Sequence, residues 1–580
     1  MSTMKEQVVR VLPDVSGLNK AFDYSVPNDL SGPPIRVGTI VRVSINGRRT
    51  AGWVVGVDTE PPEGVKLEPL LKASSFGPLP EVVDLAEWVA KEWAGRWSAV
   101  LGTASPEPYI HRLPGPSPAP VAAGPAMGAV SLFDGSGPRV VRSAPASDRF
   151  EIVRAAAALG PAIVIAPDHM TAARYAGRLA RAGVRTHRFP QEWAGGFTGG
   201  VVLGARSAAF ASVPDLASIV VIDEHDDGLI NERNPTWNAR DVAIERASRA
   251  GIPCLLVSAS PSPAVIHRVP DVRLPDRSAE RQGWPIVQVV DRRDDDPGRG
   301  GLFTGALSRR LREGGRALCI LNRKGRSVMM ACAVCGELIR TQDRQELMVE
   351  LDGKLVARRS GESRPLVCAE CGSTKLKRLR LGVTKVAEEL SVLLREPVGE
   401  VTGTSAGGEG LDNRVVVGTE ALLHRVASAR TVAFLDFDNE LLAPRYRAAE
   451  QAMALLLRAC TIVGPRADGG RVLVQTRSPN HRVLQAAMKA NPEGFTSSEL
   501  ELRAHTNLPP FGGLAQVGGT GSDAFVEPLR ERLGLEVVGP DSANKFLVKG
   551  PDRATVAAAL SAIPRPKDSR VSVAVDPPRA

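Results

Sequence analysis

Two stretches of the chain alternate short apolar runs with amphipathic helical patterns, and this alternation restricts the possible folds more than any other feature. In the first stretch the runs AIVIAP, VVLGA, IVVID and CLLVSAS are separated by helical patterns such as TAARYAGRLARAG. Strands buried on both faces of a parallel sheet read as continuous β-branched runs, and they need crossover helices between them. A second series starts near Ile286 and resumes, after a cysteine-containing segment, through VVVGTEAL, TVAFLDFD and RVLVQTR. The sequence therefore predicts a multidomain α/β protein with two parallel sheets.

The chain of 580 residues is too long for a single hydrophobic core. Its first hundred residues contain strand-like runs, an NGRR turn and a helical pattern, and its tail reads strand, helix, strand, strand, helix, strand, which suggests a split βαβ sandwich. We predict a small β-rich domain over 1–104, a Pro/Gly/Ala-rich linker over 105–138, a first α/β lobe over 139–275, a second lobe over 276–331 and 375–490, a cysteine-rich insertion over 332–374, and an α+β domain over 491–580.

The charge balance of the chain favours an acidic partner. Its formal net charge is +9 and its pI is about 9.3, which is typical of nucleic-acid-binding proteins; a solvated basic surface without a partner is the alternative. No apolar run approaches the roughly 20 residues of a membrane span. The opening MSTMKEQVVRVLPDV lacks the apolar region of a secretory signal. We therefore expect a cytoplasmic protein with no membrane partner.

Two C-x-x-C pairs, in ACAVCGE and VCAECGS, are the most specific chemical signal in the chain. Glycine follows each pair, where a positive φ costs little. Four thiolates fill a tetrahedral zinc shell and leave no open position, so we predict one structural zinc ion, with free thiols in two turns as the alternative. The predicted ligands are Cys332, Cys335, Cys368 and Cys371, followed by Gly336 and Gly372. The remaining cysteines, Cys254, Cys319 and Cys460, lie in apolar runs and are expected in the core.

The run IVVIDEHDDG, residues 219–228, ends a predicted strand with carboxylates. Motors that hydrolyse nucleotides hold magnesium in this way, and Asp223 and Glu224 would be the carboxylates here. A motor also needs a phosphate loop of the form G-x4-G-K-[ST], and no G-K-S or G-K-T occurs in this chain. The sequence therefore carries one part of a nucleotide site without the other.

The segment VVRSAPASDRFEIV is the candidate phosphate loop by position. In it Arg149 stands where the lysine would be, and Phe150 stands where the magnesium-binding hydroxyl would be. Pro145 removes an N–H donor and Asp148 adds a negative charge. We expect this loop to repel nucleotide, and we expect neither ATP nor Mg²⁺ to bind.

Ordered blocks of sequence point to a known family. They are FDY at 22–24, VLGARSAAFA at 202–211, VVIDEHDD, WNARDVAIERA at 237–247, VSASPSP at 257–263, LNRKGRS at 321–327, the cysteine pairs, DFDNELLAPRYRAAEQ at 436–451, VLVQTRSPNH at 472–481 and NLPPF at 507–511. On these blocks the chain resembles the primosomal protein N-prime family, the bacterial replication restart helicases called PriA. The resemblance covers nearly the whole chain except a shortened region after residue 104, and the shared order and spacing argue against chance.

This resemblance implies a 3′-DNA-end-binding domain, a winged helix that is reduced or absent here, two RecA-like helicase lobes, a zinc-ribbon-like insertion in the second lobe and an α+β C-terminal domain. It also implies a function in replication restart. Such proteins recognise stalled or branched forks and promote reloading of the replicative helicase through primosome and helicase-loading proteins and single-stranded-DNA-binding protein. The implied location is the cytoplasm, at the nucleoid.

The FDY match places Phe22 and Asp23, together with Gly47 of the NGRR turn, at the family's pocket for a 3′-terminal nucleotide. An aromatic face can stack on a base, and a carboxylate can accept a hydrogen bond from a terminal hydroxyl. The alternative places Phe22 in the core of the barrel and Asp23 on its surface. A lysine of the family pocket falls at Glu68, which weakens the electrostatics of the site.

Further departures from the family concern the motor. The box D-E-E-H is shortened to D-E-H, the segment after GTE at 418–420 reads ALLHRV without K-G-H, and the block Q-V-A-G-R-A-G-R appears as RACTIVGPR. The two arginine positions of that block hold Ile462 and Pro465, with Arg466 one place on. Lysine, magnesium and arginines stabilise the transition state of phosphoryl transfer together. We therefore expect no ATPase activity and interpret Asp223, Glu224 and Arg149 as vestigial.

The cysteine segment also departs from the family, which carries eight cysteines for two zinc ions. This chain keeps only the outer two pairs, which bind one ion together in the family. The inner site is replaced by RTQDRQELMVELDGKLVARRS, which we predict to be hairpin-like. KLKRLR at 375–380 either contacts phosphates or is a solvated strand edge. His225 and His424 lack metal-like neighbours at ligand spacing and are expected to be structural.

The leading hypothesis is a DNA-binding restart protein whose helicase lobes form a scaffold without ATPase activity. A first alternative is an active ATP-dependent 3′–5′ DNA helicase with an atypical nucleotide site, which predicts DNA-stimulated phosphate release. A second alternative is a zinc-stabilised interaction protein that no longer prefers forks to linear duplex at matched salt.

Overall fold

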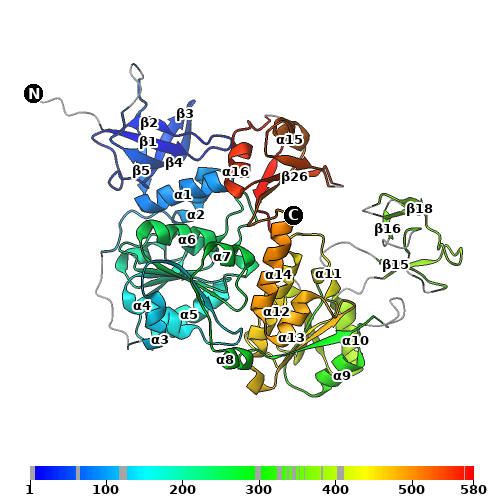
Figure 1. The fold of residues 1–580 in the computed structure, drawn as a ribbon. Helices are drawn as coiled ribbons and strands as arrows, with labels where there is room; N and C mark the ends of the chain where they lie inside the picture. Colours follow the sequence, from blue (N-terminus) through cyan, green and yellow to red (C-terminus); the bar gives the residue numbers. More distant parts are fainter. Residues whose placement is uncertain are drawn as a thin grey trace, which may run out of the picture.

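Figure 1 shows a computed structural model of the chain, which describes residues 7–579 apart from 61–63, 65, 116–123, 125–126, 294–301, 323–328, 336, 338, 343–347, 352, 358–359, 380–382, 402–409, 542 and 567–568. The small N-terminal domain and the C-terminal domain lie side by side above two α/β lobes, and the cysteine-rich insertion projects from the second lobe (Figure 1). Within these residues, no helix combines the length and the apolar character needed to cross a membrane.

The first domain is a five-stranded antiparallel sheet followed by two helices, and its strands pair in the order β2-β1-β4-β3-β5. Asn46 and Gly47 join β3 to β4 with φ values of 49° and 78°, which fits a two-residue type I′ turn and confirms the predicted turn. The elements are β1 (Val8–Pro13), β2 (Phe22–Ser25), β3 (Ile40–Ile45), β4 (Arg48–Val57), β5 (Lys72–Ser75), α1 (Pro80–Glu92) and α2 (Trp97–Ala104).

The first lobe is a seven-stranded parallel sheet in the order β12-β6-β11-β10-β7-β9-β8. Successive strand residues face two different cores, one against α4 and α5 and the other against α6. The predicted α/β alternation is confirmed here. The elements are β6 (Gly137–Arg142), α4 (Phe150–Leu159), β7 (Ala162–Ile165), α5 (His169–Arg181), β8 (Thr186–Phe189), β9 (Val201–Gly204), β10 (Ser218–Ile222), α6 (Ala239–Ala250), β11 (Pro253–Ser258), α7 (Pro263–Arg268), β12 (Val272–Arg273) and α8 (Arg277–Gln282).

The strand β6 corrects one sequence prediction, because VVR was interpreted as part of a loop that precedes the sheet. It is itself a strand, paired with β11 and β12, and Val140 and Val141 are buried. Only two consecutive apolar residues after Gly-Pro-Arg made this strand hard to recognise. Upstream of β6, the described part of 105–136 holds the short helix α3 (Met127–Val130), a 3₁₀ turn at Ser131–Phe133 and an isolated bridge from Ile110 to Phe76.

The second lobe is a six-stranded parallel sheet in the order β13-β23-β22-β14-β21-β20. Helix α14 follows this sheet and packs against both α13 and α7, so it connects the two lobes. The elements are β13 (Ile286–Asp291), α9 (Gly305–Arg312), β14 (Ala317–Ile320), α10 (Val383–Leu394), β20 (Val398–Val401), β21 (Val415–Gly418), β22 (Thr431–Phe434), α11 (Asp438–Leu441), α12 (Ala448–Val463), β23 (Arg471–Thr476), α13 (Arg482–Lys489) and α14 (Pro492–His505).

The insertion in the second lobe is made of short antiparallel strands. β15 (Met329–Cys332) pairs with β19 (Leu376–Leu379), and β16 (Met348–Leu351), β17 (Lys354–Ala357) and β18 (Ser363–Pro365) form a separate three-stranded sheet. The β16–β17 hairpin confirms the hairpin predicted for the stretch that replaces the family's inner cysteines.

The C-terminal domain has the element order that the tail predicted. β24 (Gly513–Gly518), α15 (Ser522–Arg530), β25 (Glu536–Val538), β26 (Lys545–Gly550), α16 (Arg553–Ser561) and β27 (Ser572–Val575) form an antiparallel sheet in the order β25-β26-β24-β27. This is the split βαβ arrangement. Its core joins those of the N-terminal domain and the first lobe in one buried cluster.

Candidate functional sites

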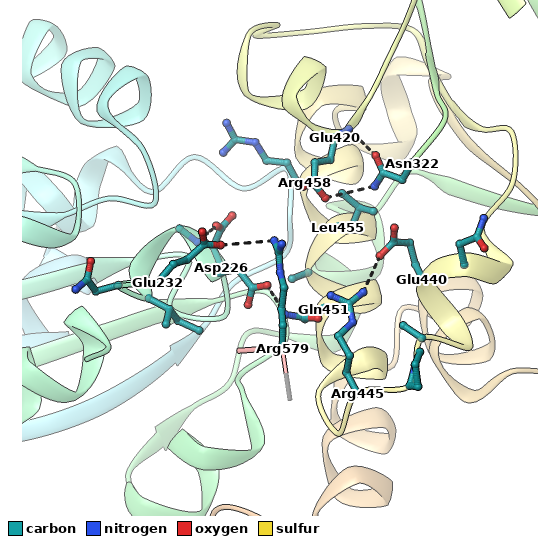
Figure 2. Close-up of a pocket in the computed structure, with 18 of the residues that line it drawn as sticks. Asp226, Glu232, Asn322, Glu420, Glu440, Arg445, Gln451, Leu455, Arg458 and Arg579 are labelled. Atoms are coloured by element: carbon teal, nitrogen blue, oxygen red, sulfur yellow. Dashed lines mark hydrogen bonds and ion pairs between the residues drawn. The ribbon is translucent and has the colours of Figure 1, made fainter. Parts of the chain in front are cut away.

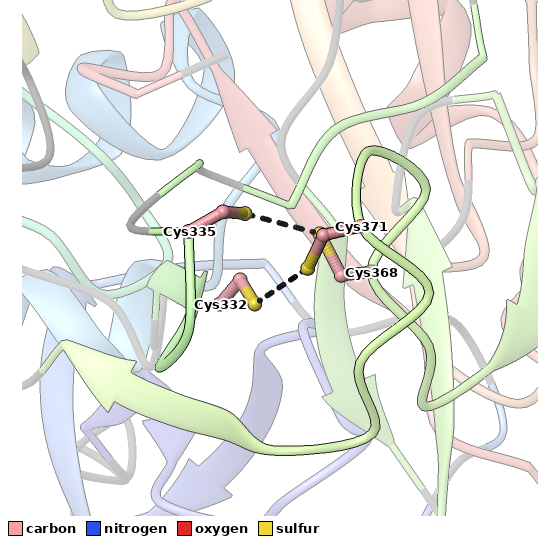
Figure 3. A group of neighbouring side chains, drawn as sticks. All are labelled: Cys332, Cys335, Cys368 and Cys371. Atoms are coloured by element: carbon pink, nitrogen blue, oxygen red, sulfur yellow. Dashed lines mark hydrogen bonds between the residues drawn. The ribbon is translucent and has the colours of Figure 1, made fainter.

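The four cysteines of the insertion converge, as Figure 3 shows. Their sulfur atoms all lie within 4.8 Å of one another, with 3.4 Å between Cys332 and Cys371 and 3.7 Å between Cys335 and Cys368. A tetrahedral site with Zn–S bonds of about 2.3 Å needs sulfurs about 3.8 Å apart, so the donor set fits zinc. Gly372 has the positive φ, +71°, expected after the second pair, while Gly336 lies outside the described residues. The cluster can hold one metal ion with no position left for a substrate.

The other three cysteines are core residues, as the sequence predicted. Cys254, Cys319 and Cys460 are fully buried among apolar neighbours. Burial raises the pKa of the thiols of Cys254 and Cys319 to about 12, so they stay protonated and unreactive at neutral pH.

The candidate phosphate loop, residues 143–149, joins β6 to α4 at the carboxyl edge of the first sheet. Arg149 precedes the first residue of α4 and is 3% exposed, and its Nη2 atom lies 3.0 Å from Oδ1 of Asp223, which directly follows β10. Asp223 adopts φ 53°, a region that few non-glycine residues occupy. Arg149 and Asp223 therefore form an ion pair between the candidate loop and the end of β10.

Several amides in and next to this loop donate to acceptors within the protein. Ser143 N donates to Ser258 O, Ala146 N to Gly283 O, and Ser147 N to Ala144 O. Phe150 N donates to Oδ1 of Asp148 at 3.1 Å. A phosphate loop instead presents its amides to the ligand. These amides of the loop therefore donate to groups of the protein and not to a bound phosphate.

The structure corrects the expectation that Asp148 adds an unpaired negative charge to the loop. Its carboxylate accepts two hydrogen bonds from Arg178 of α5, at 2.7 and 2.6 Å, and the Arg178 guanidinium lies 4.0 Å from the ring centre of Phe150. The hydrogen bond from Arg178 lowers the pKa of Asp148. Because Arg178 offsets its charge, Asp148 presents an ion pair at the loop rather than an isolated negative charge.

Glu224 is buried and engaged by the segment that follows β11. Its Oε1 accepts from Ser262 N at 2.8 Å, and its Oε2 accepts from Ser262 Oγ at 2.9 Å and from Arg240 Nη1 at 3.3 Å. His225 contacts Ser258 Oγ through Nδ1 at 2.8 Å. The structural role predicted for His225 agrees with this contact.

The end of α12 in the second lobe faces the same loop, because Thr461 Oγ donates to Pro145 O at 3.1 Å. The next residue, Ile462, is buried in the core of the second lobe. Pro465 precedes a 3₁₀ turn, and Arg466 is exposed there. An arginine at position 462 would have to leave this core to reach the loop.

Sequence reasoning missed a charged contact between the lobes. Arg458 of α12 lies 2.9 Å from Oδ2 of Asp168, the residue before α5, and His424 Nδ1 lies 3.4 Å from the same oxygen. Burial acts to raise the pKa of Asp168, but the hydrogen bond from His424 and the charge of Arg458 outweigh it and hold the pKa well below its usual value. Arg458 stands in the RACTIVGPR block, one turn before Ile462.

A cavity of about 1830 Å³ opens between the two lobes, and Figure 2 shows part of its lining. Acidic and basic side chains mix there: Arg445 pairs with Glu440 at 3.6 Å, and Arg579 of the C-terminal tail pairs with Glu232 at 3.6 Å (Figure 2). Arg149 is not part of this lining. The cavity is thus separate from the candidate phosphate loop.

In the N-terminal domain the structure places Phe22 and Asp23 at the start of β2, which pairs with β1. Asp23 accepts two hydrogen bonds from Arg10, at 2.9 and 3.1 Å, and one from Thr59 at 3.2 Å. Its carboxylate therefore keeps capacity for one further donor. Phe22 is half-buried against the barrel core and has Lys20 Nζ 5.9 Å from its ring centre.

Gly47 occupies the exposed β3–β4 turn, with no atom within 4 Å of where a Cβ would stand. None of the contacts in the described residues joins it to Phe22 or Asp23. Glu68 lies against the other side of β2: its carbonyl accepts from Ser25 N at 3.1 Å, and its charge helps raise the pKa of Tyr24, after the larger effect of burial.

Comparison with known proteins supports the relationship that these motifs suggest. A family model for the PriA 3′DNA-binding domain (3′BD) matches residues 10–106. The replication restart protein PriA of Synechocystis sp. is 30% identical over 351 residues, which are 54% of this chain and 42% of that protein. The chain thus spans less than half the length of this relative. A solved structure of a DEAD box protein from Methanococcus jannaschii is a distant likeness, with a TM-score of 0.31, 11% identity, and coverage of 63% of this chain and 89% of that one.

A longer match exists among mycobacterial proteins. The probable replication restart protein PriA of Mycobacterium tuberculosis is 29% identical over 596 aligned residues, which cover 91% of this chain and 89% of that protein. The match therefore extends from the N-terminal domain through both lobes, the insertion and the C-terminal domain. The chain therefore matches the PriA 3′ DNA-binding domain in its N-terminal part and is similar over most of its length to proteins named replication restart protein PriA.

Proposed function

We propose that this chain binds branched DNA, with a 3′ end held by its N-terminal domain, and acts in replication restart with helicase lobes that serve as a scaffold and do not hydrolyse ATP. The expected substrates are stalled or branched forks. The expected partners are primosome and helicase-loading proteins and single-stranded-DNA-binding protein. DNA as the partner is supported by the 3′ DNA-binding domain match and by the net charge of +9.

The observation that carries the scaffold proposal is the ion pair between Arg149 and Asp223. In a motor, a lysine binds the phosphates and the strand-end aspartate holds magnesium. Here the two positions carry opposite charges 3.0 Å apart, and both side chains are buried. A nucleotide with its metal would have to break this pair and leave each partner to find new contacts. Breaking a buried ion pair by removing one partner costs about 3–5 kcal/mol, which sets the scale of the barrier.

The contacts between the lobes support the same proposal. A motor closes its lobes around ATP and opens them after hydrolysis, so its interlobe contacts depend on the nucleotide. Here Arg458 already reaches Asp168, and Thr461 already donates to Pro145 of the loop. These contacts join the two lobes directly through side chains of the chain itself.

The end-binding part of the proposal rests on Phe22 and Asp23. Phe22 offers a half-buried aromatic ring on which a base can stack, and Asp23, on the other face of β2, offers one free acceptor position for a hydroxyl. Arg10 fixes the carboxylate through two hydrogen bonds, so its free position has a defined direction.

One preparation tests both parts. Phosphate release from ATP is measured with saturating fork DNA, and fork affinity is measured on forks that end in a 3′-hydroxyl or a 3′-phosphate. We expect ATP turnover at background and a preference for the 3′-hydroxyl fork that Asp23→Asn reduces and Phe22→Ala abolishes. Tyr109→Ala removes a 45% exposed ring just beyond the N-terminal helices and serves as the control. DNA-stimulated turnover above background ends the scaffold proposal, and equal affinity for both forks ends the end-binding proposal.

A further inference from the structure

A row of arginines follows the amino edge of the second sheet, the edge opposite the interlobe cavity. Arg316, Arg414 and Arg430 immediately precede the strands β14, β21 and β22, and Arg471 is the first residue of β23. These four strands are consecutive in the sheet, in the order β23-β22-β14-β21. Parallel neighbours lie about 4.8 Å apart, so the row is about 15 Å long.

The register of the sheet places these arginines nearly level with one another. Ala317 pairs with both Val415 and Thr431, so the residues before them, Arg316, Arg414 and Arg430, enter the sheet at the same height. Arg309 and Arg312 on the last turn of α9 and Arg395, shortly before β20, add to the row; Arg312 donates to Leu393 O, close to Arg395.

Most of the charge in this row is not offset by carboxylates. Arg414 pairs with Glu396, and Arg310 pairs with Glu313. The contacts of the exposed members are with backbone carbonyls instead: Arg316 donates to Leu411 O at 2.6 Å, Arg430 to Asp468 O at 3.4 Å, and Arg312 to Leu393 O at 3.5 Å. A carbonyl orients a guanidinium and leaves its positive charge in place.

The neighbouring acids confirm that the arginines converge. The pKa of Glu313 is lowered first by its hydrogen bond from Arg310, and the charges of Arg471 and Arg430 also lower it. In the described part of this edge, the acids are Glu313, Glu396, Asp412 and Asp468, against the arginines Arg309, Arg310, Arg312, Arg316, Arg395, Arg414, Arg430, Arg466 and Arg471. The edge therefore carries a clear positive excess.

This edge belongs to a part of the molecule that the proposed end-binding domain does not reach. Figure 1 places α9 and α10 at the far side of the second lobe, with β1–β5 of the N-terminal domain at the opposite corner of the molecule. Guanidinium groups bind phosphate oxygens through paired hydrogen bonds, and they retain their charge at any physiological pH. Duplex DNA presents one phosphate per about 3.4 Å of axis on each strand, so a row of about 15 Å faces about four phosphates of one strand.

We propose that this arginine row is a second DNA contact, which binds the phosphate backbone of a duplex arm while the N-terminal domain holds the end. This inference rests on the proposed DNA-binding function. It adds a second surface that contacts only phosphates and so does not distinguish one base sequence from another. A contact of this kind is a counterion-release site, so its affinity falls steeply as the salt concentration rises.

The test uses the full chain with the substitutions Arg309→Gln, Arg316→Gln and Arg430→Gln combined, since these three side chains are exposed. The charge-matched control combines Arg174→Gln, Arg181→Gln and Arg281→Gln, which are exposed on the first lobe. The probe is a 40-base-pair duplex with 3′-phosphates, alongside a fork with a 3′-hydroxyl, and affinity is measured across salt concentrations.

Each lost phosphate contact changes the slope of log affinity against log salt by about 0.9. We expect the row variant to lower the slope magnitude by two to three on both probes, to weaken duplex binding at least tenfold at low salt, and to keep the preference for a 3′-hydroxyl. The control variant should keep the wild-type slope, and thermal unfolding should show both variants folded. An unchanged slope in the row variant, or an equal loss in the control, overturns the proposal. If the wild type showed no preference for the 3′-hydroxyl fork, that result would count against the end-binding function and not against the arginine row.

Discussion

Asp227 lies where the first lobe, the second lobe and the C-terminal tail meet, and its protonation gives a sharp prediction. Its Oδ2 accepts from Gln451 Nε2 at 2.7 Å, and the same amide donates to Pro578 O at 3.0 Å. Burial raises the pKa of Asp227 to about 6, the charge of Arg447 opposes this, and Glu450 and Asp226 add to it. We predict that Asp227→Asn stabilises the folded chain at neutral pH.

The magnitude follows from the two pKa values. An aspartate with an ordinary pKa of 3.8 and a folded pKa of about 6 binds its proton more tightly in the folded chain. The stabilisation that comes from this tighter proton binding in the folded chain is fully present below about pH 4 and is lost as the pH rises through about 6. A difference of about two units corresponds to about 3 kcal/mol. Because Asp227 is half-buried and lines the interlobe cavity, water reduces this cost, and we expect a gain of about 1–2 kcal/mol.

The assay is urea unfolding followed by tryptophan fluorescence, for the wild type and Asp227→Asn, at pH 7.5 and pH 4.5. Asparagine keeps an oxygen that accepts from Gln451 and carries no charge, so the gain at pH 7.5 should shrink to about a third at pH 4.5. Glu232→Gln serves as the control, because that side chain lines the same cavity but is 70% exposed. Destabilisation by Asp227→Asn of equal size at both pH values would refute the reasoning, since it would mean that the negative charge itself holds the junction together.

Three further predictions concern the metal, the interlobe contact and the core. Wild-type protein should contain one zinc ion per chain by elemental analysis, and Cys368→Ser should remove it and make the insertion sensitive to protease while the lobes keep their melting temperature. Arg458→Ala should weaken the contact between the lobes by about 1–2 kcal/mol at neutral pH, seen as a wider interlobe distance by fluorescence energy transfer, and the effect should persist at pH 4, because the pKa of Asp168 is held well below its usual value and its carboxylate stays charged. Phe210→Ala should destabilise the first lobe by about 3–5 kcal/mol in urea unfolding, because the ring is fully buried and packs edge-on against Trp237.

The sequence predicted the parts of the fold that follow from local pattern. The continuous apolar runs of β7, β9, β10 and β11 could only be buried in a parallel sheet, and the tail gave its six elements in order. The sequence did not predict β6, because GPRVVR contains only two consecutive apolar residues. Its strand conformation depends on pairing with β11, more than 110 residues later. Local propensity gives no sign of such a partner.

The same limit applies to the candidate sites. The four cysteines were predictable because their spacing alone defines a metal site. The residues of the loop were also visible, but their pairing was not: Asp148 looked like an unpaired charge until Arg178, 30 positions away, was placed beside it. Asp168 and Arg458 lie 290 positions apart and share no motif, so no reading of the sequence connects them.

The way in which the domains share their cores gives the proposed scaffold role of the lobes a physical basis. Arg553 of α16 pairs with Glu92 of α1 and with Asp241 of α6, both at 3.1 Å, and its guanidinium lies 4.2 Å from the ring centre of Trp93. One side chain thus links the N-terminal domain, the first lobe and the C-terminal domain. Removing the first lobe would expose the apolar faces that the other two domains bury against it. Under the proposed scaffold function, the first lobe would be needed to keep the spacing between the N-terminal domain and the C-terminal domain, whether or not it binds nucleotide.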